Sequence, residues 1–203
     1  AHLEQAKNCF NNANILGAKN IRSFSFYLRE GQSRDDARGE VIDKLGRLVD
    51  LADEYGVTLC HENEAKIYGE SPERCLDILK ALDGKLRCVF DMGNFVLDGH
   101  PPFPGPYELL RDYINYFHIK DSMSVGAIVP PGCGEAHIKQ ILAAHKAYTC
   151  SDFVVTLEPH LETFDGLNKL VGKTFENPYK FETPKIAFST ALDKLENIIA
   201  EIG

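Results

Sequence analysis

The run VTLCHE, residues 57–62, decides the expected fold, because it is a short apolar segment that follows Gly56 and ends on an acid. Short apolar runs bounded by turn residues are typical of buried strands in parallel sheets. Three later runs have the same form and also carry a metal-type ligand at or near their ends: RCVFD at 87–91, NYFHIKD at 115–121 and VVTLE at 154–158. With residues Asn20 to Tyr27 as a further strand, the sequence predicts five strands.

Amphipathic helices separate these predicted strands. Ser33 and Ser71 are candidate N-caps, Pro72 and Pro184 stand at first-turn positions, and apolar residues follow each of them at helical spacing. Strands that alternate with helices predict a parallel α/β sheet, either open and doubly wound or closed as a TIM (β/α)8 barrel. A closed barrel usually needs about 250 residues. If the sheet is a closed barrel, residues 1–203 form a single partial barrel domain that lacks the first three βα units.

Composition narrows the class of partner. The chain has 30 acidic residues against 22 Lys plus Arg, a net charge of -8, which disfavours nucleic acid and anionic membranes as electrostatic partners. No apolar stretch is long enough for a membrane span, and the start has no signal-peptide pattern. Six cysteines without a C-x-x-C pair are expected to be small core residues. A cytoplasmic location is therefore expected.

Four strand ends carry the candidate chemistry: Glu62, Asp91, His118 and Glu158. A single acid at a strand end is commonly a solvated charge or a helix N-cap. In a parallel barrel, however, all strand ends meet at the face that forms the active site, so the four side chains could converge. Three carboxylates and one imidazole suit Mn²⁺ or Mg²⁺ and also accept Co²⁺ or Zn²⁺. A bound divalent ion would also relieve the repulsion among the carboxylates.

Five ordered segments resemble those of the xylose isomerase-like TIM-barrel proteins. They are HENE at 61–64, FDMGN at 90–94, YFHIKDS at 116–122, PPGCGEAH at 130–137 and TLEPHL at 156–161. That group includes sugar phosphate isomerases and epimerases, ketose 3-epimerases, inosose dehydratase and an apurinic endonuclease branch. The resemblance implies that the four ligands lie on the last four barrel strands. It also implies that Glu62 and Glu158 transfer protons from opposite faces of a ketose, through an enediolate.

The chain departs from the family pattern at two places. Many relatives have His where this chain has Asn94, and an amide cannot transfer a proton, so a substrate contact is expected there. The ketose epimerases have an arginine soon after the seventh-strand histidine. Here Lys120 and Asp121 follow instead. They either substitute for that arginine, which makes Lys120 a candidate for substrate binding, or merely pair with each other.

Other polar residues near the strand ends are weaker candidates for substrate binding. His160 either contacts substrate or orders its loop, Glu64 is either near the metal or solvated, and His100 lies in a Pro-rich loop over the same face. His61 is expected to point away from the barrel axis. The glycine-rich loop at 132–134 resembles a phosphate cradle only loosely, because no P-loop lysine follows it.

These patterns favour a metal-dependent sugar or sugar-phosphate isomerase or epimerase, whose partner is a small sugar or sugar phosphate. A polyol-ketone dehydratase of the same fold and a non-catalytic metal or sugar binder remain alternatives. The endonuclease branch is disfavoured, because the chain lacks the D-x-H pair on the seventh-strand loop and is acidic. A homo-oligomer is a further possibility, since a partial barrel exposes two sheet edges.

Overall fold

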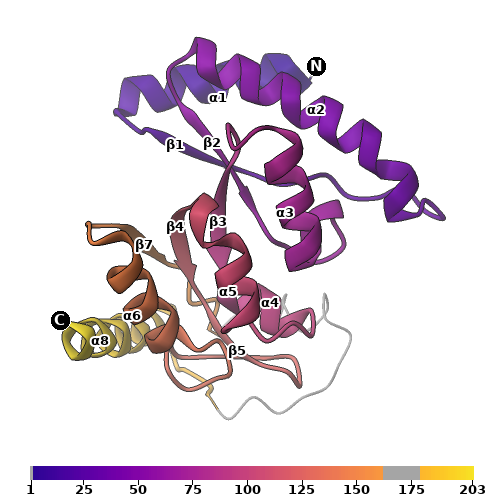
Figure 1. The fold of residues 1–203 in the computed structure, drawn as a ribbon. Coiled ribbons are helices and arrows are strands. Elements are labelled where there is room, and N and C mark those ends of the chain that lie inside the picture. Colours follow the sequence, from indigo (N-terminus) through magenta and orange to yellow (C-terminus); the bar gives the residue numbers. More distant parts are fainter. Residues whose placement is uncertain (1, 162–178) are drawn as a thin grey trace. The chain divides into compact units, whose positions relative to one another are not determined.

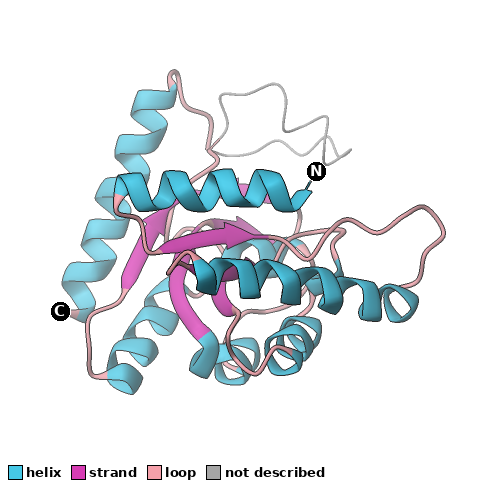
Figure 2. Cartoon of the chain, turned by 90° about the horizontal axis from the view of Figure 1, so that it is seen from above, coloured by secondary structure: helices cyan, strands magenta, loops and turns pink. Residues whose placement is uncertain are grey.

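A computed structural model describes residues 2–161 and 179–203, and helices alternate with strands through most of it (Figures 1 and 2). Contacts divide the chain into two compact units. The first runs to Val89 and includes Asp112–Asn115, and the second comprises Phe90–Arg111 and Tyr116–Gly203. Strands β3 and β4 contribute residues to both units. None of the described helices is long and apolar enough to cross a membrane.

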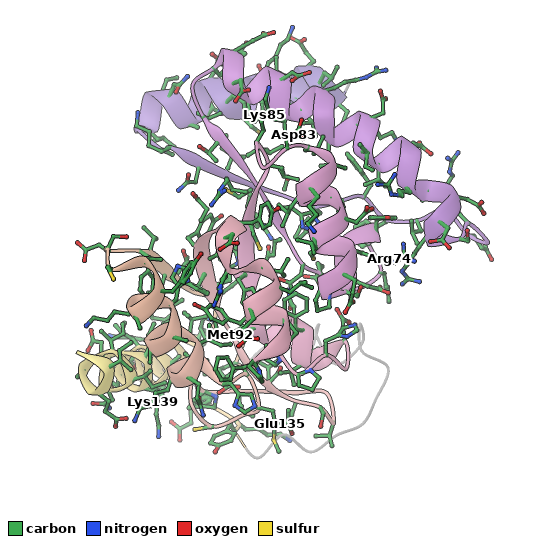
Figure 3. The ribbon with its side chains drawn as sticks, viewed as in Figure 1. Arg74, Asp83, Lys85, Met92, Glu135 and Lys139 are labelled. Carbon is green, nitrogen blue, oxygen red and sulfur yellow. The ribbon has the colours of Figure 1, made fainter. Side chains whose placement is uncertain are left out.

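The first unit is built from alternating helices and strands. Its elements are α1 (His2–Leu16), β1 (Asn20–Ser23), α2 (Arg34–Glu54), β2 (Thr58–Glu62), a 3-10 turn (Tyr68–Glu70), α3 (Pro72–Ala81) and the start of β3 (Arg87–Asp91). The two predicted caps are confirmed, because the hydroxyl of Ser33 accepts from the Asp36 amide and that of Ser71 from the Arg74 amide. Arg74, labelled in Figure 3, also donates to Asp35 at 3.1 Å and so links α3 to α2.

Strands β1, β2 and β3 are parallel, and their register aligns the strand ends. Arg22 of β1 lies opposite Cys60 of β2, and Glu62 of β2 lies opposite Val89 of β3. Val89 and Asp91 are two positions apart on the same strand and so face the same side. The register therefore places Glu62 beside the strand that continues to Asp91.

The second unit contains the remaining elements. They are α4 (Met92–Leu97), α5 (Gly105–Leu110), β4 (Ile114–Ile119), β5 (Asp121–Met123), β6 (Ala127–Val129), α6 (Ile138–Thr149), β7 (Val154–Leu157) and α8 (Pro184–Ile202), with a 3-10 turn (Arg111–Tyr113) before β4. Strands β4 and β7 are parallel, with His118 opposite Thr156. The sheet order is β1-β2-β3-β4-β7, and β5 and β6 form a separate antiparallel pair. Helix α6 is tied to α8 by Lys139, which donates to Glu201 at 2.7 Å (Figure 3).

All five predicted strands are present, but some local predictions were wrong. The first strand ends at Ser23 rather than Tyr27, because Phe26 adopts a left-handed conformation with φ 68° that breaks the extended chain. Helix α4 and the β5–β6 pair were not predicted. Cys60, Cys75 and Cys88 are buried as predicted, but Cys133 is only partly buried, and Cys9 and Cys150 are exposed. Glu64 and His100 lie in loops, as predicted.

Candidate metal centre

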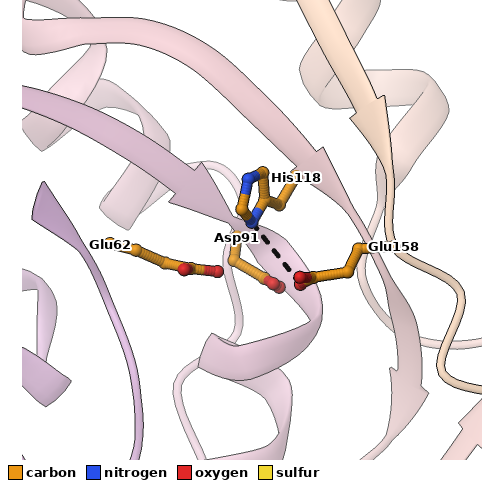
Figure 4. A group of neighbouring side chains, drawn as sticks. All are labelled: Glu62, Asp91, His118 and Glu158. Carbon is orange, nitrogen blue, oxygen red and sulfur yellow. Dashed lines mark ion pairs between the residues drawn. The ribbon is translucent and has the colours of Figure 1, made fainter. Parts of the chain in front are cut away.

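Three residues at or near strand ends in the second unit meet at one point: Asp91 at the end of β3, His118 within β4 and Glu158 after β7. Asp91 is fully buried, His118 is 7% exposed, and the Glu158 side chain is 29% exposed. Each offers one ligand atom that lies within 4.8 Å of the other two. Nδ1 of His118 is 3.4 Å from Oε2 of Glu158, as the dashed line in Figure 4 marks. The sequence prediction that these residues converge is therefore met within this unit.

Asp91 has the helix N-cap role that the sequence presented as an alternative to metal binding. Its Oδ1 accepts from the Asn94 amide at 2.8 Å, so it is the N-cap of α4. Its Oδ2 accepts from Lys120 Nζ at 3.0 Å. Because the capping bond uses one oxygen, the N-cap role fixes the carboxylate without excluding it as a ligand.

Lys120 is the buried cation of this group, with 3% of its surface exposed. Its ammonium donates to Asn94 Oδ1 at 2.9 Å and to Asp91 Oδ2, and lies 3.4 Å from Glu158 Oε2. The sequence left open an ion pair of Lys120 with Asp121, but the structure pairs Lys120 with Asp91 and Glu158 instead.

Glu158 is held in its charged form. Burial raises the pKa of its carboxyl, but the hydrogen bond with His118 and the charges of Lys120, His118 and His160 outweigh burial and lower that pKa to about 2. The amide of Glu158 donates to the Ile119 carbonyl at 3.1 Å, which fixes the backbone just beyond β7. Glu158 is thus an ionised carboxylate at neutral pH.

Glu62 belongs to the first unit, where it ends β2 with 1% of its surface exposed (Figure 4). Nη1 of Arg22 donates to its Oε2 at 2.6 Å. The Arg22 guanidinium also lies over the Phe24 ring, 4.5 Å from its centre. Sequence reasoning missed Arg22. The contact depends on strand register, which places Arg22 opposite Cys60, two residues before Glu62 on the same side of β2, and the sequence alone does not give that register.

The remaining predicted substrate residues fall into two groups. His160 and Asn94 belong to the centre, since His160 Nε2 is 3.9 Å from Glu158 Oε1 and Asn94 binds Lys120. Glu64 accepts from the neighbouring Ala65 amide, and the His100 ring packs edge-on against Phe95. Those two contacts are local and do not join either residue to the centre.

The glycine-rich loop encloses a carboxylate of the chain itself. Asp121 is 1% exposed, and its two oxygens accept from four backbone amides: those of Ser122, Gly132, Gly134 and Ala136, at 2.8 to 3.1 Å. Backbone amides that converge in this way bind anions. Because Asp121 fills this position, the loop is part of the scaffold, and Asp121 does not pair with Lys120.

The donor set fits a divalent cation. It combines carboxylate oxygens with one imidazole nitrogen in a buried group, the combination preferred by Mg²⁺ and Mn²⁺ and accepted by Zn²⁺.

The comparisons with known proteins agree with this architecture. The model of the family described as Xylose isomerase-like TIM barrel matches residues 1–176, so the chain belongs to that family. The predicted α/β fold class and family are thereby confirmed. No curated protein sequence matches the chain significantly.

Solved structures with the same fold share little sequence with this chain. A zinc-bound IolI protein is 18% identical with a TM-score of 0.74, over 99% of this chain and 70% of that one. A xylose isomerase-like TIM-barrel protein from Mycobacterium smegmatis in complex with magnesium is 17% identical with a TM-score of 0.70, over 99% and 68%. D-Psicose 3-epimerase from Clostridium cellulolyticum H10, solved with D-tagatose, is 12% identical with a TM-score of 0.74, over 97% and 69%. At these identities the likeness establishes the fold alone.

Proposed function

We propose that this protein is a metal-dependent sugar or sugar-phosphate isomerase or epimerase. The observation that carries the proposal is the meeting of buried Asp91 and His118 with half-buried Glu158, whose ligand atoms lie within 4.8 Å of one another. Glu62, aligned by register with the strand that leads to Asp91, is proposed as the fourth ligand. Lys120 and Arg22 offset part of the negative charge of these carboxylates, and a bound divalent ion would relieve the repulsion that is left.

The proposed ion is Mn²⁺ or Mg²⁺, because oxygen donors predominate. Two structures of the same fold contain zinc or magnesium, which supports a divalent ion in a protein of this fold. When bound, such an ion would polarise the carbonyl of a ketose and lower the cost of removing the adjacent proton.

Proton transfer is assigned to the two glutamates. Glu158 is ionised at neutral pH, so it can accept the proton on the carbon beside the carbonyl. Glu62 is held in place by Arg22 and can return or accept a proton from the other side of the substrate. His160, whose side chain is 45% exposed and adjoins Glu158, is placed to bind a substrate hydroxyl.

The experiment is proton exchange in D₂O. Ketoses and ketose phosphates are incubated with Mn²⁺-loaded protein, freed of metal and followed by proton NMR. We expect the wild-type protein to exchange the proton on the carbon beside the carbonyl for deuterium. Glu158→Gln should abolish this exchange while retaining more metal than Asp91→Ala. Glu196→Gln, a change at an exposed position of α8, is the matched control and should behave as wild type.

Two outcomes would contradict the proposal. Undiminished exchange by Glu158→Gln would remove Glu158 from proton transfer. Metal binding without exchange across the panel would favour the dehydratase or the non-catalytic binder. Product stereochemistry in the positive case separates an epimerase from an isomerase.

A further inference from the structure

The Lys120 ammonium lies on the same carboxylates that the proposed metal site uses. It contacts Asp91 Oδ2 at 3.0 Å and lies 3.4 Å from Glu158 Oε2, and Asn94 Oδ1 completes its surroundings at 2.9 Å. A lysine buried to this extent is costly unless its charge is compensated. The two carboxylates supply that compensation.

The backbone around Lys120 fixes it in this place. A Cβ on Gly93 would lie 2.7 Å from the Lys120 carbonyl oxygen and 2.8 Å from its Cγ, so the lysine stem packs directly on the start of α4. The Ser122 hydroxyl donates to the Gly93 carbonyl at 2.8 Å and ties the same two segments together. Lys120 therefore reaches the carboxylates from a rigid position.

We propose that Lys120 is a resident cation of this centre, which competes with the divalent ion for Asp91 and Glu158. It stabilises the two carboxylates when no ion is bound, and a divalent ion must displace its ammonium from at least one of them. The lysine thus lowers the affinity of the site for metal and raises the stability of the metal-free protein. This assigns Lys120 as a positioning residue, in place of the substrate-binding role expected from the sequence.

The physical argument is one of charge. Two cations that share carboxylates repel each other, and in a buried site this repulsion is weakly screened. Removal of the lysine charge leaves the carboxylates to the metal alone, which tightens metal binding. The same removal leaves them unpaired when metal is absent, which destabilises that form.

The test compares Lys120→Met, which removes the charge and keeps much of the stem, with Lys120→Arg, which keeps the charge. In EDTA, Lys120→Met should unfold at a lower temperature than wild type. By calorimetric titration, Lys120→Met should bind Mn²⁺ about tenfold more tightly or better, whereas Lys120→Arg should remain within about threefold of wild type.

The outcomes distinguish a failure of this inference from a failure of the proposed metal site, on which the Mn²⁺ titration rests. If wild type binds Mn²⁺ and Lys120→Met binds it equally or more weakly, competition by Lys120 is overturned and the metal site stands. If wild type binds no divalent ion, the proposed function itself fails, and the competition fails with it. An unchanged unfolding temperature of Lys120→Met in EDTA would overturn the stabilising role.

A measurement on wild type keeps the test valid if Lys120→Met does not fold. Lysine side chains are labelled with ¹⁵N, and Lys120→Arg assigns the Lys120 ammonium signal. Saturating Mg²⁺ should shift that signal strongly and leave exposed lysines such as Lys85 in place. An unmoved Lys120 signal at saturation would overturn the inference.

Discussion

Asp91 and Asp121 are both buried carboxylates of the second unit, yet they are compensated in opposite ways. Asp91 accepts from the backbone amide of Asn94 and from the side-chain ammonium of Lys120. Asp121 receives four backbone amides, and burial raises its pKa while those bonds lower it. Burial alone therefore does not mark a functional acid.

The identity of the partners separates the two roles. Backbone amides cannot leave without unfolding the loop, so the Asp121 interactions are permanent. A side-chain ammonium can move, so the Asp91 interaction can be exchanged for another cation. If this distinction holds, changes at Asp121 should affect stability and changes at Asp91 should affect metal binding.

The largest effect is expected from Asp121→Ala. This change leaves four buried amides without their acceptor, and we expect a loss of roughly 3 to 5 kcal/mol in the free energy of unfolding, measured by urea titration. Asp121→Asn, which keeps one acceptor oxygen, should lose less. A loss below about 1 kcal/mol for Asp121→Ala would show that water replaces the carboxylate easily.

His61 adds a third case, a buried titratable group without compensation. It is fully buried, and neither ring nitrogen has a hydrogen-bond partner in the described part of the chain. Burial lowers its pKa from 6.5 to about 4, against the opposing charge of Glu62. Between these values the unfolded chain binds a proton that the folded chain does not, so stability is lost as the pH falls from 6.5 towards 4.

His61→Leu should remove this part of the acid sensitivity. Relative to its own stability at pH 7, wild type should lose up to about 3 kcal/mol from this group at pH 4, and the variant should not. Urea titrations at both pH values measure the difference, with the exposed His2→Leu as control. An equal pH dependence in His61→Leu and wild type would contradict the assignment.

Asp91→Asn tests the aspartate whose cation is expected to be exchangeable. The change keeps an oxygen that can cap α4 but removes the charge, so Mn²⁺ affinity should fall about a hundredfold or more, close to 3 kcal/mol. Calorimetric titration measures it, and Asp121→Asn should retain metal affinity. Equal losses in the two variants would mean that the loop around Asp121 also governs the metal site.

Much of this arrangement could be predicted from the sequence because it follows from local rules. Apolar runs bounded by turn residues located the strands, and Ser33 and Ser71 marked helix starts through their capping geometry. The convergence of Asp91, His118 and Glu158 followed from topology, since parallel strands end at a common edge.

The partners of the charged groups could not be predicted, because they depend on register and loop shape. Arg22 reaches Glu62 from a strand 40 residues earlier, and Asp121 collects amides up to 15 residues later. The sequence placed Lys120 next to Asp121, but adjacent residues of an extended chain point to opposite sides. Helix α4 was missed because its six residues carry too short a pattern to detect.

The smallest effects are expected from alanine substitutions of two glycines, Gly134 beside Asp121 and Gly93 beside Lys120. In Gly134→Ala the new methyl would overlap Asp121 Oδ1 and lie 2.5 Å from the Ser122 carbonyl oxygen, and in Gly93→Ala it would press on Lys120. Each should lose about 1 to 3 kcal/mol in urea unfolding. Gly39→Ala, with open space around the new methyl on α2, is the control and should gain slightly in stability.

The comparison of the two aspartates also predicts that only Gly93→Ala alters Mn²⁺ affinity, because it displaces the exchangeable Lys120 ammonium. Gly134→Ala instead strains the permanent contact of Asp121 with its four backbone amides. A change in metal affinity from Gly134→Ala alone would reverse the roles assigned to the two aspartates.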